Sequence, residues 1–422
     1  MTSCRFCGAN VHKILDLGHQ PPSNSFLTRE QLREPETHYP LELFICNSCA
    51  LVQIKEAKKV SDIFTDDYVY YSSESPANVT HAKEYCEMMM NRYCPRTILE
   101  VGSNDGYLLQ HFHKAGREVY GVDPAKGPAL EARRKGIFTY NAFFGKAFIT
   151  SQEGRSLAGK LDLICGINVL NHQSDINDFV DGLKMGLAPN GVITFEFPHL
   201  LPMIKKCEWD TIYHEHLNYY SLDVICKIFL AHDLWVFDVD EIPEHGGSLR
   251  IYATHKPAML ELPISANHKM EKRMGKVISD EAAARLTDLQ TYYDYAKRVT
   301  TNQASLRKFV RDRMSLGSTF AAYGAAAKAN TLFNSCGLGP HDIKYVVDRS
   351  PYKITKFLPG SHIPVVGQTE LLASKPDYVI VTAWNFKEEI MEQLAFIGSW
   401  GGAFVIPIPE VVVISPWKWR NK

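Results

Sequence analysis

A short run of residues, Tyr213-His-Glu-His216, combines side chains that can move protons. His and Glu are the commonest general bases, and a Tyr hydroxyl can stabilise a developing oxyanion. The zinc-protease pattern H-E-x-x-H puts both His on one helix face, whereas alternate residues share a face only on a strand. A proton-transfer site is therefore the favoured interpretation. A metal site and a surface cluster without function are the alternatives.

A second candidate site is an acidic, glycine-containing turn, Gly102-Ser-Asn-Asp-Gly106, which follows the apolar run 97–101. It differs from the fingerprint G-x-G-x-x-G, which binds a pyrophosphate. The carboxylates of Glu100 and Asp105 would repel a pyrophosphate. The two acids suit the ammonium and sulfonium groups of S-adenosylmethionine. Asp123 ends the next predicted strand, about 20 residues on, where an acid accepts ribose hydroxyls. The predicted cofactor residues are Glu100, Gly102, Asn104, Asp105, Gly106, Asp123 and Asn168, with a nicotinamide cofactor or an unliganded fold as alternatives.

Four cysteines near the N-terminus form two CxxC pairs, Cys4 with Cys7 and Cys46 with Cys49. A CxxC turn points two thiolates at one ion, and tetrahedral zinc takes four. The gap between the pairs exceeds the usual roughly 15–20 residues, so a loop domain must lie between them. The two prolines in 20–26, Gln-Pro-Pro-Ser-Asn-Ser-Phe, indicate an ordered loop there. We predict a structural zinc; free thiols and a thioredoxin-like redox pair are the alternatives.

The elements that carry these residues alternate between strand and helix. Apolar runs at 161–170 and 191–198 predict buried strands, and 175–187 has helical spacing. This alternation is typical of a parallel, doubly wound sheet. Two further strands at 235–240 and 248–254 have a short connection, which favours an antiparallel pair at the sheet edge.

The C-terminal part reads as a second small α/β fold. Residues 260–314 are helix-like, and a strand–turn–helix pattern starts at Thr319. Further strands are expected at 343–348, 378–382 and 404–407. A second cofactor is an alternative only, because Gly324 stands alone before three alanines.

Composition excludes several classes of function. The chain has 46 Lys and Arg against 47 Asp and Glu, and no basic stripe, which argues against a nucleic-acid partner. The first residues lack an apolar signal region, and no stretch approaches a membrane span. We therefore expect a cytoplasmic protein without a membrane partner. Ten cysteines are too sparse for a disulfide scaffold.

The order of the motifs resembles that of the sugar C-3′-methyltransferase family, which makes branched deoxysugars. The shared features are the CxxC pairs, the E-x-G-S-N-D-G turn, the Tyr-His-Glu-His run and His245-Gly-Gly-Ser-Leu-Arg250. The resemblance covers nearly the whole chain. It implies an α/β fold with a zinc-binding domain at 1–70, a class I methyltransferase sheet at 71–258, and a helical segment with a Rossmann-like substrate domain at 259–422.

The resemblance also implies a reaction. A base would remove the C-3 proton of a nucleotide-linked 4-keto-6-deoxyhexose, and the enolate would attack the methyl group of S-adenosylmethionine. His216 would be the base, Glu215 would orient or tune it, and Tyr213 would face the keto oxygen. His172 and Tyr70 match further family active-site residues, although His172 can also be read as a capping or core residue and Tyr71 is the rival of Tyr70.

The residues expected to hold the nucleotide and its phosphates are Ser248, Arg250, Tyr323, Lys328 and Asn330. For Arg250, a surface charge on an edge strand is the alternative. Two other functions stay open: an O- or N-methyltransferase, and a non-catalytic zinc-containing binding protein. The sequence predicts no oligomeric state.

Overall fold

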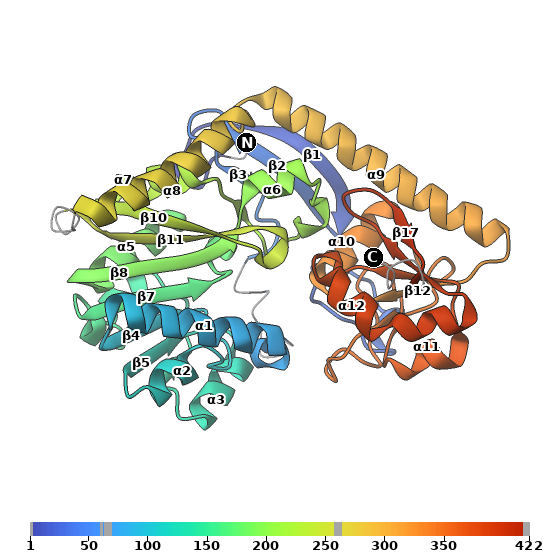
Figure 1. The fold of residues 1–422 in the computed structure, drawn as a ribbon, viewed down its shortest axis with the longest axis horizontal. Coiled ribbons are helices and arrows are strands. Elements are labelled where there is room, and N and C mark those ends of the chain that lie inside the picture. Colours follow the sequence, from blue (N-terminus) through green and yellow to red (C-terminus); the bar gives the residue numbers. More distant parts are fainter. Residues whose placement is uncertain (1–2, 60–61, 63–69, 257–263, 417–422) are drawn as a thin grey trace. The chain divides into compact units, whose positions relative to one another are not determined.

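The computed structural model describes residues 3–59, 62, 70–256 and 264–416 (Figure 1). It divides into two compact units, each built from separate stretches of the chain. Unit 1 comprises residues 1–12, 45–201 and 217–287, and unit 2 comprises residues 13–44, 202–216 and 288–422. The first 70 residues therefore contribute to both units.

Unit 1 contains a seven-stranded sheet in the order β10-β11-β8-β7-β4-β5-β6 (Figure 1). Neighbours from β8 through β6 are parallel. β11 is antiparallel to both β8 and β10, which confirms the predicted antiparallel pair. The strands are β4 (Thr97–Val101), β5 (Glu118–Val122), β6 (Thr139–Tyr140), β7 (Leu161–Ile167), β8 (Leu187–Pro198), β10 (Leu234–Ile242) and β11 (Ser248–His255).

Alternate residues of the central strands face two separate apolar cores, because successive side chains of a strand point to opposite faces. Ile98 packs in one core with residues of α1 and α2, whereas Leu99 packs in the other with residues of α5 and α7. The helices are α1 (Pro76–Tyr93), α2 (Leu109–Lys114), α3 (Lys126–Arg134), α4 (Lys146–Thr150), α5 (Ile176–Gly186), α6 (Leu200–Lys205), α7 (Leu222–Ala231) and α8 (Ile264–Ala283).

Short strands lie near the cysteine pairs. β3 (Val52–Ile54) pairs antiparallel with β9 (Asn218–Tyr219). β1 (Val11–Gln20) and β2 (Tyr39–Cys46) are neighbours in a sheet and lie near the two ends of the segment between the CxxC pairs.

Unit 2 contains a six-stranded sheet in the order β14-β13-β12-β15-β16-β17, the strand order 3-2-1-4-5-6 of dinucleotide-binding folds. All neighbours are parallel except β17. This confirms the predicted Rossmann-like fold. The strands are β12 (Phe320–Tyr323), β13 (Val346–Val347), β14 (Val365–Val366), β15 (Tyr378–Val381), β16 (Ala403–Ile406) and β17 (Val412–Ile414).

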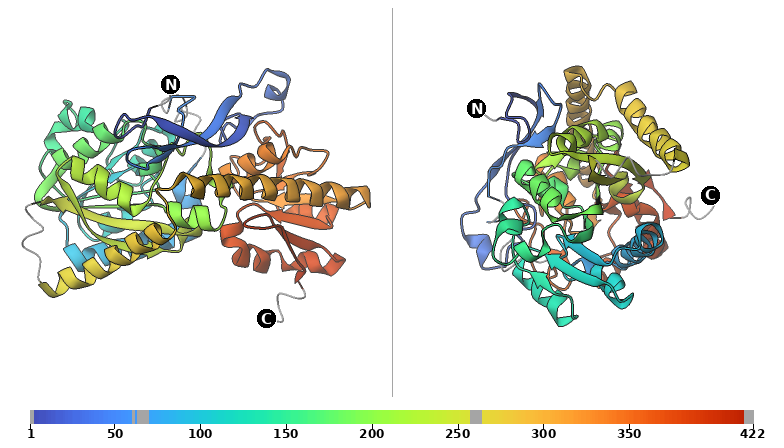
Figure 2. Two further views of the ribbon diagram at one scale, coloured as in Figure 1. Left: turned by 90° about the horizontal axis from the view of Figure 1, so that it is seen from above. Right: turned by 90° about the vertical axis from the view of Figure 1, so that its left-hand side faces the viewer.

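The long helix α9 (Leu289–Ser315) lies along this part of unit 2 (Figure 2). The Phe309 ring packs edge-on against Phe320 of β12 and Tyr378 of β15. The other helices are α10 (Ala327–Cys336), α11 (Thr369–Ser374) and α12 (Lys387–Gln393). Among the described residues, none of the helices is both long enough and apolar enough to span a membrane.

Candidate active site

The predicted cofactor turn is a buried cluster of acids at the carboxyl end of β4. Both carboxylate oxygens of Glu100 and Oδ1 of Asp105 are buried and lack a hydrogen-bond partner among the described residues. Burial raises the pKa of Glu100 well above its usual value, and the charges of Asp123 and Asp105 raise it further. Gly102 has φ +67°, and a Cβ there would lie 2.5 Å from Cγ2 of Val169. Only glycine therefore fits at position 102.

Asp123 occupies the predicted place at the end of β5. Its Oδ2 accepts a hydrogen bond from the backbone N–H of Asn104, and its Oδ1 accepts one from that of Ala125, both at 2.8 Å. Burial raises the pKa of Asp123 to about 6, and these two bonds partly oppose that rise. The turn is thereby held against the strand that follows it.

The side chain of Asn104 ties the turn to the segment that carries Tyr70. Its Oδ1 accepts from the backbone N–H of Ser72 at 2.8 Å, and its Nδ2 donates to the carbonyl of Tyr70 at 3.1 Å. Asp105 adds a bond from the Ser73 hydroxyl and an ion pair with Lys135 at 3.0 Å. Sequence reasoning assigned Asn104 to the cofactor and missed this connection, since nothing in the sequence links the turn to residues 70–73.

These residues fit S-adenosylmethionine. The charges of Asp105 and Asp123 raise the pKa of Glu100, and the charge of Asp105 raises the pKa of Asp123. These acids, with carboxylate oxygens of Glu100 and Asp105 that have no partner among the described residues, favour a cationic ligand over a pyrophosphate. Asp123 lies where an acid holds ribose hydroxyls in this type of fold. The glycines allow the backbone to approach a ligand closely.

Asn168 and His172 follow β7. Asn168 has a left-handed backbone (φ +57°), and its N–H donates to the carbonyl of Glu196 at 2.8 Å. His172 ends a short 3-10 helix, Leu170–His172, at the same edge of the sheet as the acidic turn, because β7 and β4 are parallel neighbours. Tyr70 is 45 % exposed, and its hydroxyl accepts from Nδ2 of Asn78 at 3.2 Å.

Arg250 lies in a buried ionic network. Its Nε donates to Oε1 of Glu196 at 2.6 Å, and Nε2 of His81 lies 2.6 Å from Oε2 of the same carboxylate. Burial alone would raise the pKa of Glu196, but His81 and Arg250 lower it overall. Arg250 is therefore committed to Glu196, and the surface-charge alternative is wrong, since Arg250 is buried on a strand inside the sheet. Ser248 is also buried and donates to the carbonyl of Glu244 at 2.9 Å.

The predicted proton-transfer run lies in unit 2. Nδ1 of His216 lies 3.0 Å from the carbonyl oxygen of Thr211, and its Nε2 lies 2.5 Å from the hydroxyl oxygen of Tyr213. A carbonyl only accepts, so Nδ1 carries a hydrogen. In the neutral ring Nε2 then accepts from Tyr213, which makes Nε2 the basic atom.

The segment before this run is fixed by three side-chain bonds within unit 2. The indole N–H of Trp209 donates to Asn302, and the indole N–H of Trp384 donates to Asp210. The Thr331 hydroxyl donates to the carbonyl of Ile212 at 2.9 Å. The carbonyl of Thr211, which sets the tautomer of His216, therefore has a rigid support.

Unit 2 also contains the predicted nucleotide-binding residues of the C-terminal fold. Nζ of Lys328, in the first turn of α10, is buried without a hydrogen-bond partner in the described part of the chain and lies 4.7 Å from the Trp384 ring centre. The Tyr323 hydroxyl and Oδ1 of Asn330 are also buried without such a partner among described residues. Nδ2 of Asn330 donates to the carbonyl of Ser23.

Two buried acids face Lys328. Burial raises the pKa of Glu208 to about 7 and that of Asp210 to about 6, and the charge of Lys328 opposes both rises. Glu208 and Asp210 lie a few residues before Tyr213-His-Glu-His216 in the sequence. One short segment therefore carries both the candidate base and the acids that face Lys328. Sequence reasoning did not single out either acid.

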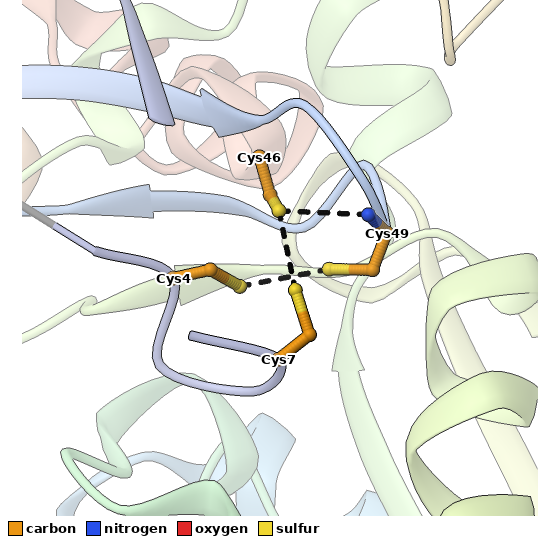
Figure 3. A group of neighbouring side chains, drawn as sticks. All are labelled: Cys4, Cys7, Cys46 and Cys49. Carbon is orange, nitrogen blue, oxygen red and sulfur yellow. Dashed lines mark hydrogen bonds between the residues drawn. The ribbon is translucent and has the colours of Figure 1, made fainter. Parts of the chain in front are cut away.

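The four cysteines of the CxxC pairs converge in unit 1 (Figure 3). Their sulfurs all lie within 4.8 Å of one another, with Cys4–Cys49 at 3.5 Å and Cys7–Cys46 at 3.4 Å. Tetrahedral zinc with Zn–S bonds of about 2.3 Å requires sulfurs roughly 3.8 Å apart, so the cluster fits that ion. The backbone N–H groups of Ser48 and Cys49 point to Sγ of Cys46, as expected around a thiolate.

The structure thus divides the predicted residues between the units. Unit 1 holds the cysteines, the acidic turn, Tyr70, His172, Ser248 and Arg250; unit 2 holds Tyr213, Glu215, His216, Tyr323, Lys328 and Asn330.

Comparison with known proteins identifies the family. Residues 4–64 match a family described as "Putative zinc binding domain", residues 78–238 a "Methyltransferase domain", and residues 243–409 a "C-methyltransferase C-terminal domain". The C-methyltransferase NovU of Streptomyces niveus is 32% identical over 419 residues, which cover 98% of this chain and 96% of NovU. The chain belongs to this C-methyltransferase family.

More distant similarity is confined to part of the chain. A ubiquinone biosynthesis O-methyltransferase of Histophilus somni (strain 2336) is 27% identical over 26% of this chain and 49% of that protein. An S-adenosylmethionine-dependent methyltransferase of Mesorhizobium loti aligns with 42% of this chain and 99% of its own at 14% identity and a TM-score of 0.35. The predicted fold class is confirmed by the sheet orders and the family matches, and the protein is an S-adenosylmethionine-dependent C-methyltransferase.

Proposed function

We propose that this C-methyltransferase adds a methyl group to C-3 of a nucleotide-linked 4-keto-6-deoxy sugar by way of an enolate. The observation that carries the proposal is the state of His216. Thr211 holds a hydrogen on Nδ1, and the basic Nε2 faces the hydroxyl of Tyr213. A base paired with an oxyanion partner suits carbon acidified by a neighbouring ketone, whereas methylation of a hydroxyl needs no such pair.

The cofactor supplies an electrophilic methyl group when it is bound. Glu100, Asp105 and Asp123 would hold its positive charge and its ribose. Nε2 of His216 would take the C-3 proton of the sugar, and Tyr213 would donate a hydrogen bond to the keto oxygen as negative charge develops there. The enolate carbon would then form the new C–C bond as the bond between the methyl group and the sulfonium sulfur breaks, which leaves S-adenosylhomocysteine. By the family resemblance, His172 and Tyr70 are further candidate active-site residues.

The C-terminal fold would hold the nucleotide. The first turn of α10 and the ammonium of Lys328 offer positive potential for phosphate groups. Tyr323 and Asn330 retain buried polar atoms that have no partner among the described residues, and these suit further polar contacts. The nucleotide diphosphate is therefore the part of the substrate we assign to unit 2.

The four thiolates would bind one structural zinc. Cys4, Cys46 and Cys49 pack among the apolar side chains of a core that also contains Leu183 and Ile225 of the methyltransferase fold. A metal in this position supports the fold and takes no part in the chemistry, since four protein thiolates leave no open position for a substrate.

The test is incubation with S-adenosylmethionine and a panel of nucleotide 4-keto-6-deoxy sugars, followed by mass spectrometry and NMR. We expect one sugar to gain a CH2 as a C-methyl group, with an equal amount of S-adenosylhomocysteine. In deuterated water, the C-3 proton should also exchange in an enzyme-dependent manner. Cofactor binding with no gain of mass by any sugar, or a methyl group on oxygen, would reject the proposal.

A further inference from the structure

The loop between the cysteine pairs delivers a side chain to the candidate active site. Nδ2 of Asn24 donates a hydrogen bond to Oε1 of Glu215 at 2.7 Å. Glu215 is only 3 % exposed and Asn24 is half-buried, so this bond is partly shielded from water. Both residues belong to unit 2, although Glu215 follows Asn24 by 191 positions in the sequence.

The loop that carries Asn24 is itself held in place on both sides. The Ser23 carbonyl accepts from the Asn330 side chain, and Gln20 donates to the Ser335 hydroxyl at 2.7 Å. After Asn24, Leu27 and Phe357 exchange both backbone hydrogen bonds. A rigid loop can place an amide with the accuracy that a neighbouring catalytic group needs.

The donor is chemically matched to its acceptor. An amide N–H carries no charge, so it stabilises the ionised carboxylate and leaves the negative charge in place. A Lys or Arg side chain would neutralise that charge. A hydrogen bond to the charged form lowers the pKa of a carboxylic acid, whereas burial raises it. The Asn24 amide therefore opposes the effect of burial on Glu215.

We infer that Asn24 is a positioning residue, which holds the Glu215 carboxylate ionised and correctly oriented beside the base His216. The inference rests on the proposed function. It gives the long segment between the cysteine pairs a role in the reaction, because 13–44 belongs to the same unit as Tyr213-His-Glu-His216.

The first test needs no substrate. Carboxyl carbons of glutamate are labelled with ¹³C in the full-length protein, and the Glu215 signal is assigned by its loss in Glu215→Gln. We expect Asn24→Ala to raise the pH at which Glu215 titrates, and Asn24→Asp to raise it further, since two carboxylates then compete for one proton. The matched control is Ser25→Ala, an exposed neighbour in the same loop. Titration of Glu215 as in the wild type in both Asn24 variants would overturn the inference.

The second test separates positioning from mere support of the fold. Asn24→Ala should lower kcat by about tenfold or more, the loss expected for a hydrogen bond to a charged group, and leave both KM values nearly unchanged. The acid limb of its pH profile should move to higher pH. Wild-type kcat and an unshifted limb would contradict the inference.

The double variant Asn24→Asp with Glu215→Gln reverses donor and acceptor and keeps the hydrogen bond. We expect it to recover the thermal stability that Asn24→Ala loses but not the turnover, because the negative charge has moved to position 24. Recovery of full turnover would reduce Asn24 to a structural residue. If Glu215 titrates as predicted but no panel sugar is methylated by the wild type, the proposed substrate fails while the Asn24–Glu215 relationship stands.

Discussion

Asp123 and Asp348 make equivalent pairs of hydrogen bonds in the two units. Each follows the second strand of its fold and accepts from a backbone N–H in the turn after the first strand, Asn104 at 2.8 Å or Ala325 at 2.7 Å. Each also accepts from the N–H two positions further on. The same pair of hydrogen bonds therefore shapes the turn after the first strand in both α/β folds.

Because the two acids occupy equivalent places in different units, we expect each to affect the ligand of its own unit. Asp123→Asn should weaken S-adenosylmethionine binding by roughly 10- to 100-fold, because a bond to a charged acceptor is lost, and should spare nucleotide binding. Asp348→Asn should do the reverse. Calorimetric titration of both variants with the cofactor and with a nucleoside diphosphate measures this. Equal losses for both ligands in either variant would contradict the assignment.

Cofactor affinity should also depend on pH through Asp123. Its pKa in the free protein is about 6, raised by burial, so the carboxylate is protonated below that pH and is a poorer acceptor. Affinity should therefore rise as the pH increases through 6 and level off above 7. Asp123→Asn removes this titrating group, so its affinity should rise less than that of the wild type over that interval.

His216→Asn should lower turnover by roughly 10²- to 10⁴-fold, the usual loss for a general base, with cofactor affinity retained because the cofactor residues lie in unit 1. Deuterium exchange at C-3 should disappear with turnover. Tyr213→Phe should reduce turnover less, since the base remains. Exchange at the wild-type rate in His216→Asn would show that another residue removes the proton.

Much of this architecture could be predicted from the sequence. The sequence predicts the strand positions in both folds. Parallel strands that are buried on both faces consist of continuous apolar runs, such as the one that begins at Leu161. The four cysteines and the acids Glu100 and Asp123 were found because their spacing is local. The Tyr213–His216 pair followed from residue type alone.

The contacts between distant segments could not be predicted. Asn24 meets Glu215, and Trp384 meets Asp210, only through tertiary structure. The prediction of a substrate contact for Arg250 stays untested, and no sequence pattern indicates that Glu196 pairs with Arg250 across β8 and β11. Side-chain partners of this kind depend on strand register, which a one-residue shift would change completely.

The ion pair between Arg250 and Glu196 allows a test of whether Arg250 supports the fold or binds the substrate. Arg250→Met removes one partner and leaves Glu196 buried beside His81, so the free energy of unfolding should fall by about 3–5 kcal/mol. Substrate affinity, measured at a temperature where the variant is folded, should change little. A variant as stable as the wild type that binds the nucleotide sugar far more weakly would support the predicted substrate contact of Arg250.

The buried acid Glu208 should make stability depend on pH. Its folded-state pKa, about 7, exceeds that of the unfolded chain, so it contributes stability below pH 4.5 that is lost as the pH rises through 7. In Glu208→Gln the free energy of unfolding should not show this decrease with pH, because the amide does not titrate. The variant should match the wild type near pH 4 and exceed its free energy of unfolding by up to about 3 kcal/mol near pH 8. Denaturant unfolding at both pH values measures the difference, and a constant difference would exclude Glu208 as its source.

Zinc removal should damage the cofactor-binding unit, because the cysteines pack in its core. Cys4 and Cys46 share that core with Leu183, and Nδ2 of Asn177 in α5 donates to the carbonyls of Arg5 and Phe6 inside the first CxxC turn. Cys4→Ser, or chelation of the metal, should therefore lower the unfolding temperature and weaken S-adenosylmethionine binding together, since metal binding is coupled to folding. The control is Cys94→Ser, an exposed cysteine outside the cluster. Metal analysis should give one zinc per chain in the control and less in Cys4→Ser. A zinc-free Cys4→Ser protein that keeps wild-type stability and cofactor affinity would show that the cluster does not support the methyltransferase fold.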